Sequence, residues 1–118
     1  KPLASKRILR QMQQKEVRGS FTITGSNPAF IFRRPQGTLP KDFILHFNNR
    51  LESNSLTKLL FDFDGQFSQN MSVKIDATPG VNRYLVKTNG KLKRFAVIPS
   101  GQEPEQADIK FVQLLKPE

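Results

Sequence analysis

The sequence predicts an all-β protein: an antiparallel two-sheet β-sandwich, jelly-roll-like, with about eight strands. Apolar and polar residues alternate over short segments from residue 19 onward. A period of two is that of a strand buried on one face, because successive side chains point to opposite sides. Turn residues interrupt these segments at a spacing of roughly ten residues, which is typical of sandwiches.

The composition fits one domain with a core made mainly of phenylalanine. A chain of 118 residues corresponds to a single domain that buries about two-thirds of its unfolded surface. It contains 10 Phe, one Tyr and no Trp, so Phe has to fill the interior. Because there is no Cys, disulfides and thiolate metal sites are excluded.

The basic charge is concentrated at the start of the chain. The net charge is +9, and residues 1–18 hold six basic side chains against Glu16 alone. We expect these residues to form a basic tail or solvated linker, with a short amphipathic helix or a juxtamembrane segment as alternatives. Residues 19–118 are expected to form the sandwich. No apolar run is long enough to span a membrane, and a chain opening on Lys1 suggests a piece of a longer protein.

The first half of the sandwich contains three predicted strands. Residues 20–24 and 29–32 form two short ones, separated by a turn cluster at Gly25–Pro28. Residues 43–47 form the third. Its alternation places one set of side chains inward and another outward: Phe43, Leu45 and Phe47 face the core, and Ile44, His46 and Asn48 face out.

The stretch 59–76 is predicted as two strands around a polar corner. We expect its inward side chains to be Leu59, Phe61, Phe63, Val73 and Ile75, with Leu60 outward. The corner contains Asp62 and Asp64 before Gly65, which resembles the start of a calcium loop. Such a loop needs further oxygen ligands and a late Glu, which are missing, so an ordinary turn is favoured over a structural calcium site.

The last third of the chain predicts a hairpin and a closing strand. Asn89-Gly90 lies between residues 82–88 and 91–98, and this dipeptide is a strong signal for a type I′ hairpin turn. Residues 91–98 are therefore expected to pair back on 82–88. In residues 107–115 the apolar positions do not alternate cleanly, which indicates a β-bulge or burial on both faces.

No arrangement of residues points to catalysis. His46 is the single histidine, no Cys accompanies it, and the acidic residues are dispersed. A carboxylate pair for glycoside hydrolysis cannot be named, and the glycines are too sparse for a phosphate-binding loop. We therefore expect a protein that is not an enzyme, with no cofactor and no metal site.

Ligand binding is the remaining class of function. The outward residues His46, Asn48 and Arg50 supply hydrogen-bonding groups for sugar hydroxyls, and Tyr84 is the aromatic ring that could stack on a sugar. These four residues form the predicted ligand-binding site. Nucleic-acid binding is disfavoured, because readers of single strands interleave basic charge with exposed aromatic rings and most Phe here occupy inward positions.

The second half of the chain resembles a known family. Gly65-Gln66-Phe67-Ser68 matches a glycine-containing corner, Tyr84 a leading aromatic residue, and Phe95–Pro99 a strand end. Together they resemble the β-sandwich accessory domains found beside glycosyltransferases or membrane-embedded sugar transferases in bacterial cell-surface polysaccharide synthesis. Ala96 and Ile98 stand where that family has an Arg and an acid, so no role of that pair carries over.

The resemblance implies a non-catalytic, carbohydrate-associated module of a larger bacterial envelope-biosynthesis protein. Its partners would be an oligosaccharide or an adjacent catalytic domain of the same chain. Its place would be the cell envelope or the cytoplasm of a bacterium. The alternatives are an interaction module that docks on protein or on an anionic surface through residues 1–18, and then a nucleic-acid-binding module.

Overall fold

The computed structural model describes residues 1–14, 21–100 and 106–117. Within these ranges the chain forms ten strands and one short 3-10 helix: β1 (Lys6–Arg10), β2 (Met12–Gln14), β3 (Phe21–Ile23), β4 (Ala29–Arg33), β5 (Asp42–Asn49), β6 (Ser55–Asp62), η1 (Gln69–Met71), β7 (Ser72–Ala77), β8 (Gly80–Lys87), β9 (Arg94–Ile98) and β10 (Ile109–Leu115). The predicted all-β class is confirmed. Strands β3 to β10 correspond to the eight expected, and β1 and β2 are additional.

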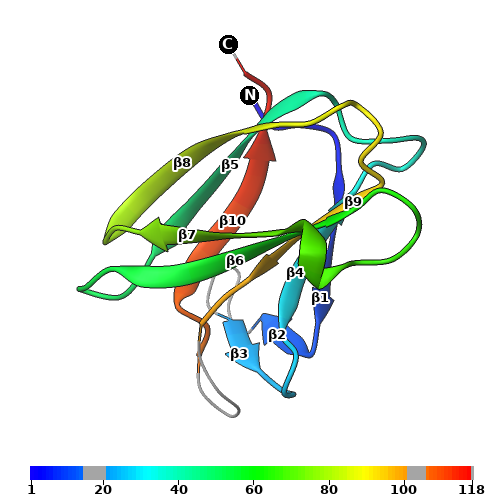
Figure 1. The fold of residues 1–118 in the computed structure, drawn as a ribbon. Helices are drawn as coiled ribbons and strands as arrows, with labels where there is room; N and C mark the ends of the chain where they lie inside the picture. Colours follow the sequence, from blue (N-terminus) through cyan, green and yellow to red (C-terminus); the bar gives the residue numbers. More distant parts are fainter. Residues whose placement is uncertain (15–20, 101–105, 118) are drawn as a thin grey trace.

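Two antiparallel sheets form the sandwich. One has five strands in the order β1-β4-β9-β6-β7, and the other has three in the order β10-β5-β8. Strands β2 and β3 form a separate antiparallel pair at the lower end in Figure 1. Every strand pairing recorded is antiparallel, as the sequence predicts.

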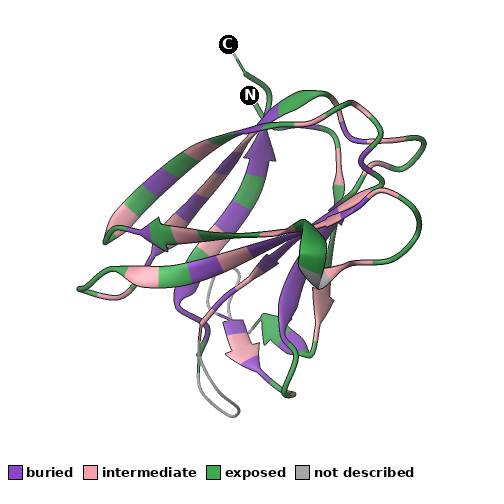
Figure 2. Cartoon of the chain, viewed as in Figure 1, coloured by how far each residue is buried: buried purple, intermediate pink, exposed green. Residues whose placement is uncertain are grey.

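The core between the sheets is rich in phenylalanine. Phe21 packs edge-on against Phe30 with ring centroids 4.8 Å apart, and Phe43 packs against Phe95 at 5.2 Å. Strand β5 alternates along its length as predicted, visible as purple and pink bands in Figure 2. Its inward side chains are buried and its outward ones half-buried: Phe43, Leu45 and Phe47 against Ile44, His46 and Asn48.

A second, smaller apolar cluster lies on the outer face of the five-stranded sheet. Leu60 points to the outward side of β6, as predicted, but it is buried there with Ala29, Ile31 and Ala96. This side of the sheet is not open to solvent, because the segment that follows β6 folds back over it. It brings Phe67, which packs on the cluster and covers it.

Strand β7 is less buried than predicted. Val73 was expected in the core but is 48% exposed, whereas Ile75 is half-buried against the core. The reason is that β7 is the edge of its sheet, and the facing strand β8 diverges from it beyond the turn that joins them (Figure 1). The inner face of β7 is therefore uncovered at its Ser72 end.

The basic N-terminal segment is part of the sheets, contrary to the expected solvated linker. Strand β1 pairs along its whole length with β4. Before it, the amide of Leu3 donates to the carbonyl of Leu114 at 2.9 Å on β10. Leu3 and Met12 are buried. Strand β4 is buried on both faces and needs a backbone partner at its edge, which β1 supplies. Residues 15–18 lie outside the described ranges.

Residues 1–14 thus connect the two sheets along one side of the sandwich. The opposite side, between β7 and β8, has no such segment among the described residues. Both chain ends lie close together at the top in Figure 1, where the amide of Lys116 donates to the carbonyl of Lys1 at 2.8 Å. One long side is therefore closed and the other open.

The hairpin predicted at Asn89-Gly90 does not form. Strand β8 pairs with β5, whereas β9 pairs with β4 and β6 in the other sheet. The turn chemistry is present, since Gly90 has φ of 81° and the amide of Lys91 donates to Asn89 Oδ1 at 2.9 Å. The flanking backbone, however, bonds to the segment before β5: the amide of Thr88 donates to the Lys41 carbonyl at 2.7 Å. The turn crosses between sheets.

The predicted irregularity of the last strand is confirmed. The pairing of β10 with β5 shifts register between Ile109 and Val112, as a β-bulge does. Among the described residues, no helix has the length and apolar character needed to cross a membrane.

Candidate functional site

The open side of the sandwich contains a groove, hereafter the Phe61 groove. Strands β7 and β8 are joined by a short turn and then diverge (Figure 1), leaving a hollow of about 320 Å³. Its lining comes from both sheets and from η1: Phe61, Phe63, Asn70, Met71, Ser72, Val73, Lys87 and Thr88. A second hollow of about 270 Å³ continues from it along the corner after β6, and shares Phe61, Phe63 and Met71.

Two aromatic rings form the floor of the Phe61 groove. Phe61 lies on the inner face of β6, packed against the core. Phe63 follows two positions later, just past the end of that strand. Their rings are nearly parallel, with an interplanar angle of 15° and centroids 6.4 Å apart. Phe61 also packs on the buried ring of Phe95 at 5.4 Å. The pair is held from below by the core and stays half-buried, so its rings are available to a ligand.

The rim of the groove mixes apolar and polar groups. Met71 and Val73 are 46% and 48% exposed, and Lys87 is exposed beside them. Thr88 is fixed in place, since its hydroxyl accepts from the amide of Gly90 at 3.2 Å. An apolar, aromatic floor with a few polar groups at the rim is the usual composition of a small-molecule site.

His46 and Asn48 lie together on a different surface, the outer face of the three-stranded sheet. Gln113 on β10 lies opposite His46 on β5, and its Nε2 is 3.0 Å from the imidazole Nδ1. The ring of Phe111 packs edge-on against His46 at 5.5 Å. Partial burial, and secondarily the charge of Arg83, lowers the pKa of His46. The imidazole is therefore neutral at pH 7 and can accept a hydrogen bond.

Arg50 and Tyr84 do not join that surface. The guanidinium of Arg50 donates to the main-chain carbonyls of Ala107 and Gln106, so it ties the end of β5 to the segment that precedes β10. Tyr84 points inward from β8, stacks on Phe47 with centroids 6.0 Å apart, and donates through its hydroxyl to the Asp76 carbonyl at 3.3 Å.

The structure therefore separates the four predicted residues: His46 and Asn48 lie on the outer sheet face, Tyr84 points inward, and Arg50 bonds to the main chain before β10. Burial, and secondarily Asp76, raises the pKa of Tyr84, which keeps its hydroxyl protonated as a donor. Tyr84 does not lie on the same face as His46 and Asn48, because two residues that pair directly across neighbouring strands point to the same side of the sheet. Tyr84 is opposite Leu45, an inward residue.

The sequence reasoning missed the groove residues. Phe61 and Phe63 were assigned to the core from their alternation, although Phe63 lies past the end of β6, where no neighbouring strand covers it. The sequence does contain a sign that Phe63 is accessible. Asp62 and Asp64 flank it, and Gly65 follows Asp64. On the outer sheet face, exposed Val81 and Leu85 were also missed.

The Asp-Gly corner that borders the groove is a turn whose carboxylates are already engaged. Asp62 Oδ1 accepts from the amide of Gly65 at 2.6 Å, and its Oδ2 contacts Arg94 Nε at 2.5 Å. Asp64 Oδ1 accepts from the amide of Gln66 at 3.4 Å. Gly65 has φ of 107°, which favours glycine. The described residues include no cluster of three or more potential metal ligands.

Comparison with known proteins gives one informative structural likeness. No family model matches the chain, and no curated protein matches it in sequence. A solved structure of a mutant family 29 carbohydrate-binding module, studied for the mechanism of ligand recognition, superposes with a TM-score of 0.53. The alignment covers 95% of this chain and 81% of that one, at 12% identity. The likeness shows a shared β-sandwich fold.

Proposed function

We propose that the protein is a non-catalytic module that binds an oligosaccharide in the Phe61 groove. The observation that carries this proposal is the half-exposed, nearly parallel ring pair of Phe61 and Phe63 on the floor of a hollow of about 320 Å³. The likeness in fold to a carbohydrate-binding module supports it independently of that geometry.

The chemistry of the groove suits a sugar chain. One face of a pyranose ring carries C–H groups, which pack on the electron-rich face of an aromatic ring. The hydroxyls at the edge of the sugar need hydrogen-bonding partners, and Asn70, Lys87 and Thr88 lie at the rim. The groove is open to solvent and continues into the second hollow of about 270 Å³, which gives a linear sugar chain room to extend.

The energetic expectation is a weak interaction. Phenylalanine offers no polar group of its own, and the site contains no Trp, because the chain has none. Small ligands gain affinity from the surface they bury and the polar contacts they complete, and an open groove buries one side of a sugar only. We expect dissociation constants on the order of millimolar, about −4 kcal/mol in binding free energy.

A titration of the ¹⁵N-labelled chain with neutral oligosaccharides tests the proposal. Oligomers of glucose, mannose, xylose and N-acetylglucosamine are added separately, and amide shifts are mapped. We expect shifts at Phe63, Met71, Val73 and Thr88. Shifts confined to His46 and Asn48 would move the site to the outer sheet face, and no shifts with any of these saccharides would refute the binding of neutral sugar rings in the Phe61 groove.

The setting we propose is that of an accessory domain in a larger bacterial protein of envelope polysaccharide synthesis, beside a glycosyltransferase-type catalytic domain. Support comes from the resemblance of the corner at Gly65–Ser68, of Tyr84 and of the Phe95–Pro99 strand end to such domains. The full-length chain tests this directly: a sugar-transferase domain next to residues 1–118 is expected, and an unrelated neighbour would contradict it.

A further inference from the structure

A row of cations crosses the outer face of the five-stranded sheet at one end. Lys6 on β1 is directly opposite Arg33 on β4. The register of β4 with β9 pairs Phe32 with Phe95, and one step further along both strands places Arg33 opposite Arg94. The row ends at Asp62 on β6, opposite Arg94. Like charges directly opposite one another on a sheet are destabilising, so three adjacent cations indicate a function.

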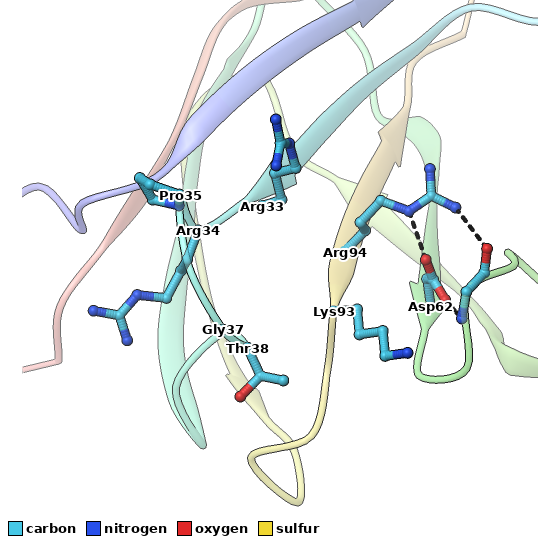
Figure 3. Close-up of a pocket in the computed structure, with 9 residues that line it drawn as sticks. Arg33, Arg34, Pro35, Gly37, Thr38, Asp62, Lys93 and Arg94 are labelled. Carbon is cyan, nitrogen blue, oxygen red and sulfur yellow. Dashed lines mark hydrogen bonds and ion pairs between the residues drawn. The ribbon is translucent and has the colours of Figure 1, made fainter.

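A hollow of about 430 Å³ lies beside this row, hereafter the cationic hollow (Figure 3). Its lining comes from the end of β4, the loop after it, the start of β9 and the corner after β6: Arg33, Arg34, Pro35, Gly37, Thr38, Asp62, Gly65, Lys93 and Arg94. Four of these residues are cationic and one is acidic. The volume is within the range of ligand sites, roughly 300–1,000 Å³.

The single acid does not neutralise the cationic hollow, because it is already paired. Asp62 is buried and contacts Arg94, which also lies over the ring of Phe67 at 4.3 Å. Arg33, Arg34 and Lys93 have no carboxylate within ion-pair distance among the described residues. Three cationic residues therefore line the hollow without a counter-charge from this part of the chain.

The walls of the cationic hollow are fixed by hydrogen bonds. The hydroxyl of Thr38 donates to the carbonyl of Gly90 at 2.8 Å, and the amide of Leu39 donates to the carbonyl of Leu92 at 2.7 Å. The amide of Lys93 donates to the carbonyl of Asp62 at 2.8 Å. The loop after β4 and the segment before β9 are thereby held against each other, so the main chain that carries the cations is fixed.

The cations surround the hollow and do not converge on one point. In Figure 3 the Arg34 side chain extends to the side opposite Arg94, with Arg33 and Lys93 between them. A single small anion would contact one or two of these groups at most. A chain with repeated acidic groups matches their distribution better, because each group can meet a different cation.

The corner after β6 lies between the cationic hollow and the continuation of the Phe61 groove. Asp62 and Gly65 line the hollow, while Phe63, Asp64 and Gln66 of the same corner line the smaller continuation of the groove. A sugar chain that passes over this corner has aromatic rings on one side and free cations on the other.

From this arrangement we infer that the ligand is an acidic oligosaccharide, whose carboxylate or sulfate groups bind Arg33, Arg34 and Lys93 while its sugar rings lie on Phe61 and Phe63. The inference rests on the proposed function and adds the class of glycan. The shared chemistry is a polyanionic sugar chain, and its two sources, uronate and sulfate ester, are separated in the experiment.

The test compares matched ligands by calorimetry at low salt. A galacturonic acid hexamer is set against its methyl ester, which has the same backbone without charge, and against a sulfated hexasaccharide. We expect at least one acidic hexamer to bind about tenfold more tightly than the methyl ester, and the difference to vanish at about 1 M salt, where the Debye length is near 3 Å. Equal affinities would overturn the inference.

Matched charge variants locate the effect. The triple variant Arg33→Gln, Arg34→Gln and Lys93→Gln removes the free cations of the hollow, while Arg83→Gln, Lys110→Gln and Lys116→Gln removes three exposed cations elsewhere. The first should abolish the tenfold preference and the second should preserve it. Equal losses in both would show a non-specific charge effect and overturn the inference. Thermal melts confirm that both variants fold.

The two proposals fail separately. If the methyl ester binds as tightly as the acidic hexamers and its binding depends on Phe63, the groove proposal stands and the acidic ligand is rejected. If the acidic hexamers bind more tightly and this preference depends on Arg33 but not on Phe63, the cationic hollow stands as the site and the groove is rejected. Tighter Arg33-dependent binding of a thymidine dodecamer or of phosphatidylserine vesicles than of either acidic hexamer would overturn the assignment to a glycan.

Discussion

Arg94 Nε contacts the buried carboxylate of Asp62 at 2.5 Å, and this ion pair joins β9 to the corner that separates the groove from the cationic hollow. Asp62 is 1% exposed and Arg94 33%. The pair therefore joins a buried carboxylate to a partly exposed guanidinium. Arg94 also covers Phe67, so the same side chain seals the outer apolar cluster.

Removing Arg94 should destabilise the domain. In Arg94→Ala the Oδ2 atom of Asp62 loses its charged partner, and an unsatisfied buried polar group costs about 1–3 kcal/mol. We expect the free energy of unfolding, measured by urea denaturation, to fall by that amount. Arg33→Ala is the control, since Arg33 is exposed and unpaired among the described residues, and its effect should stay within about 0.5 kcal/mol. Equal losses would contradict the role of the pair.

Deleting residues 1–14 should unfold the domain or nearly so. The deletion removes the backbone partner of β4 and the buried side chains of Leu3 and Met12. Losing one such side chain costs about 2–5 kcal/mol, against a typical domain stability of about 5–15 kcal/mol. A circular-dichroism melt measures the outcome. A truncated chain with an unchanged melting temperature would show that the segment is a tail after all.

The stability should depend on pH through Asp108. Burial raises the pKa of Asp108 above its usual 3.8, and this effect outweighs the hydrogen bonds from Ser55 and Ser100, which lower it. The folded state thus retains a proton that the unfolded state releases. The resulting stabilisation is complete below the unfolded pKa and is lost as pH rises through the folded pKa.

Asp108→Asn tests this pH dependence. The amide oxygen can still accept from the Ser100 amide, as Asp108 Oδ1 does at 2.9 Å, and Asn has no charge to bury. We expect urea denaturation to show the wild type losing stability relative to this variant as pH rises above about 4 and through the folded pKa of Asp108. A wild type that gains on the variant as pH rises would contradict the direction of the shift.

The strands that sequence predicts well are those with one buried face. In β5, each inward residue is fully buried, so the alternation in the sequence is complete. Strand β1 gives no such signal, because KRILR is exposed or half-exposed throughout and is ordered by backbone pairing with β4. A segment that contributes hydrogen bonds more than buried side chains cannot be recognised from hydrophobic periodicity.

The two candidate surfaces were equally hard to predict, for different physical reasons. Phe61 and Phe63 have the pattern of core residues, and only the divergence of β7 from β8 leaves their rings accessible. The cationic hollow joins Arg33 with Lys93, sixty positions apart in sequence, because β4 and β9 are neighbours in the sheet. Local turn chemistry at Asn89-Gly90 gave no information about that pairing.

Replacing Phe63 by a larger ring should strengthen binding. In Phe63→Trp the indole enlarges the stacking surface and adds an N–H donor at a position past the end of β6, where there is space in the groove. We expect a several-fold gain in affinity for whichever oligosaccharide shifts the amide resonances of the groove residues in the titration. Weaker binding, with the melting temperature unchanged, would contradict stacking at this position.

The most direct test of the account is a comparison of Phe63→Ala with Phe111→Ala. Both rings are half-buried, one in the Phe61 groove and the other beside His46 on the outer sheet face. Affinity is measured by calorimetry with the best oligosaccharide of the panel. The account predicts that Phe63→Ala lowers affinity at least tenfold, or about 1.4 kcal/mol, whereas Phe111→Ala leaves it unchanged. The reverse pattern would contradict the account.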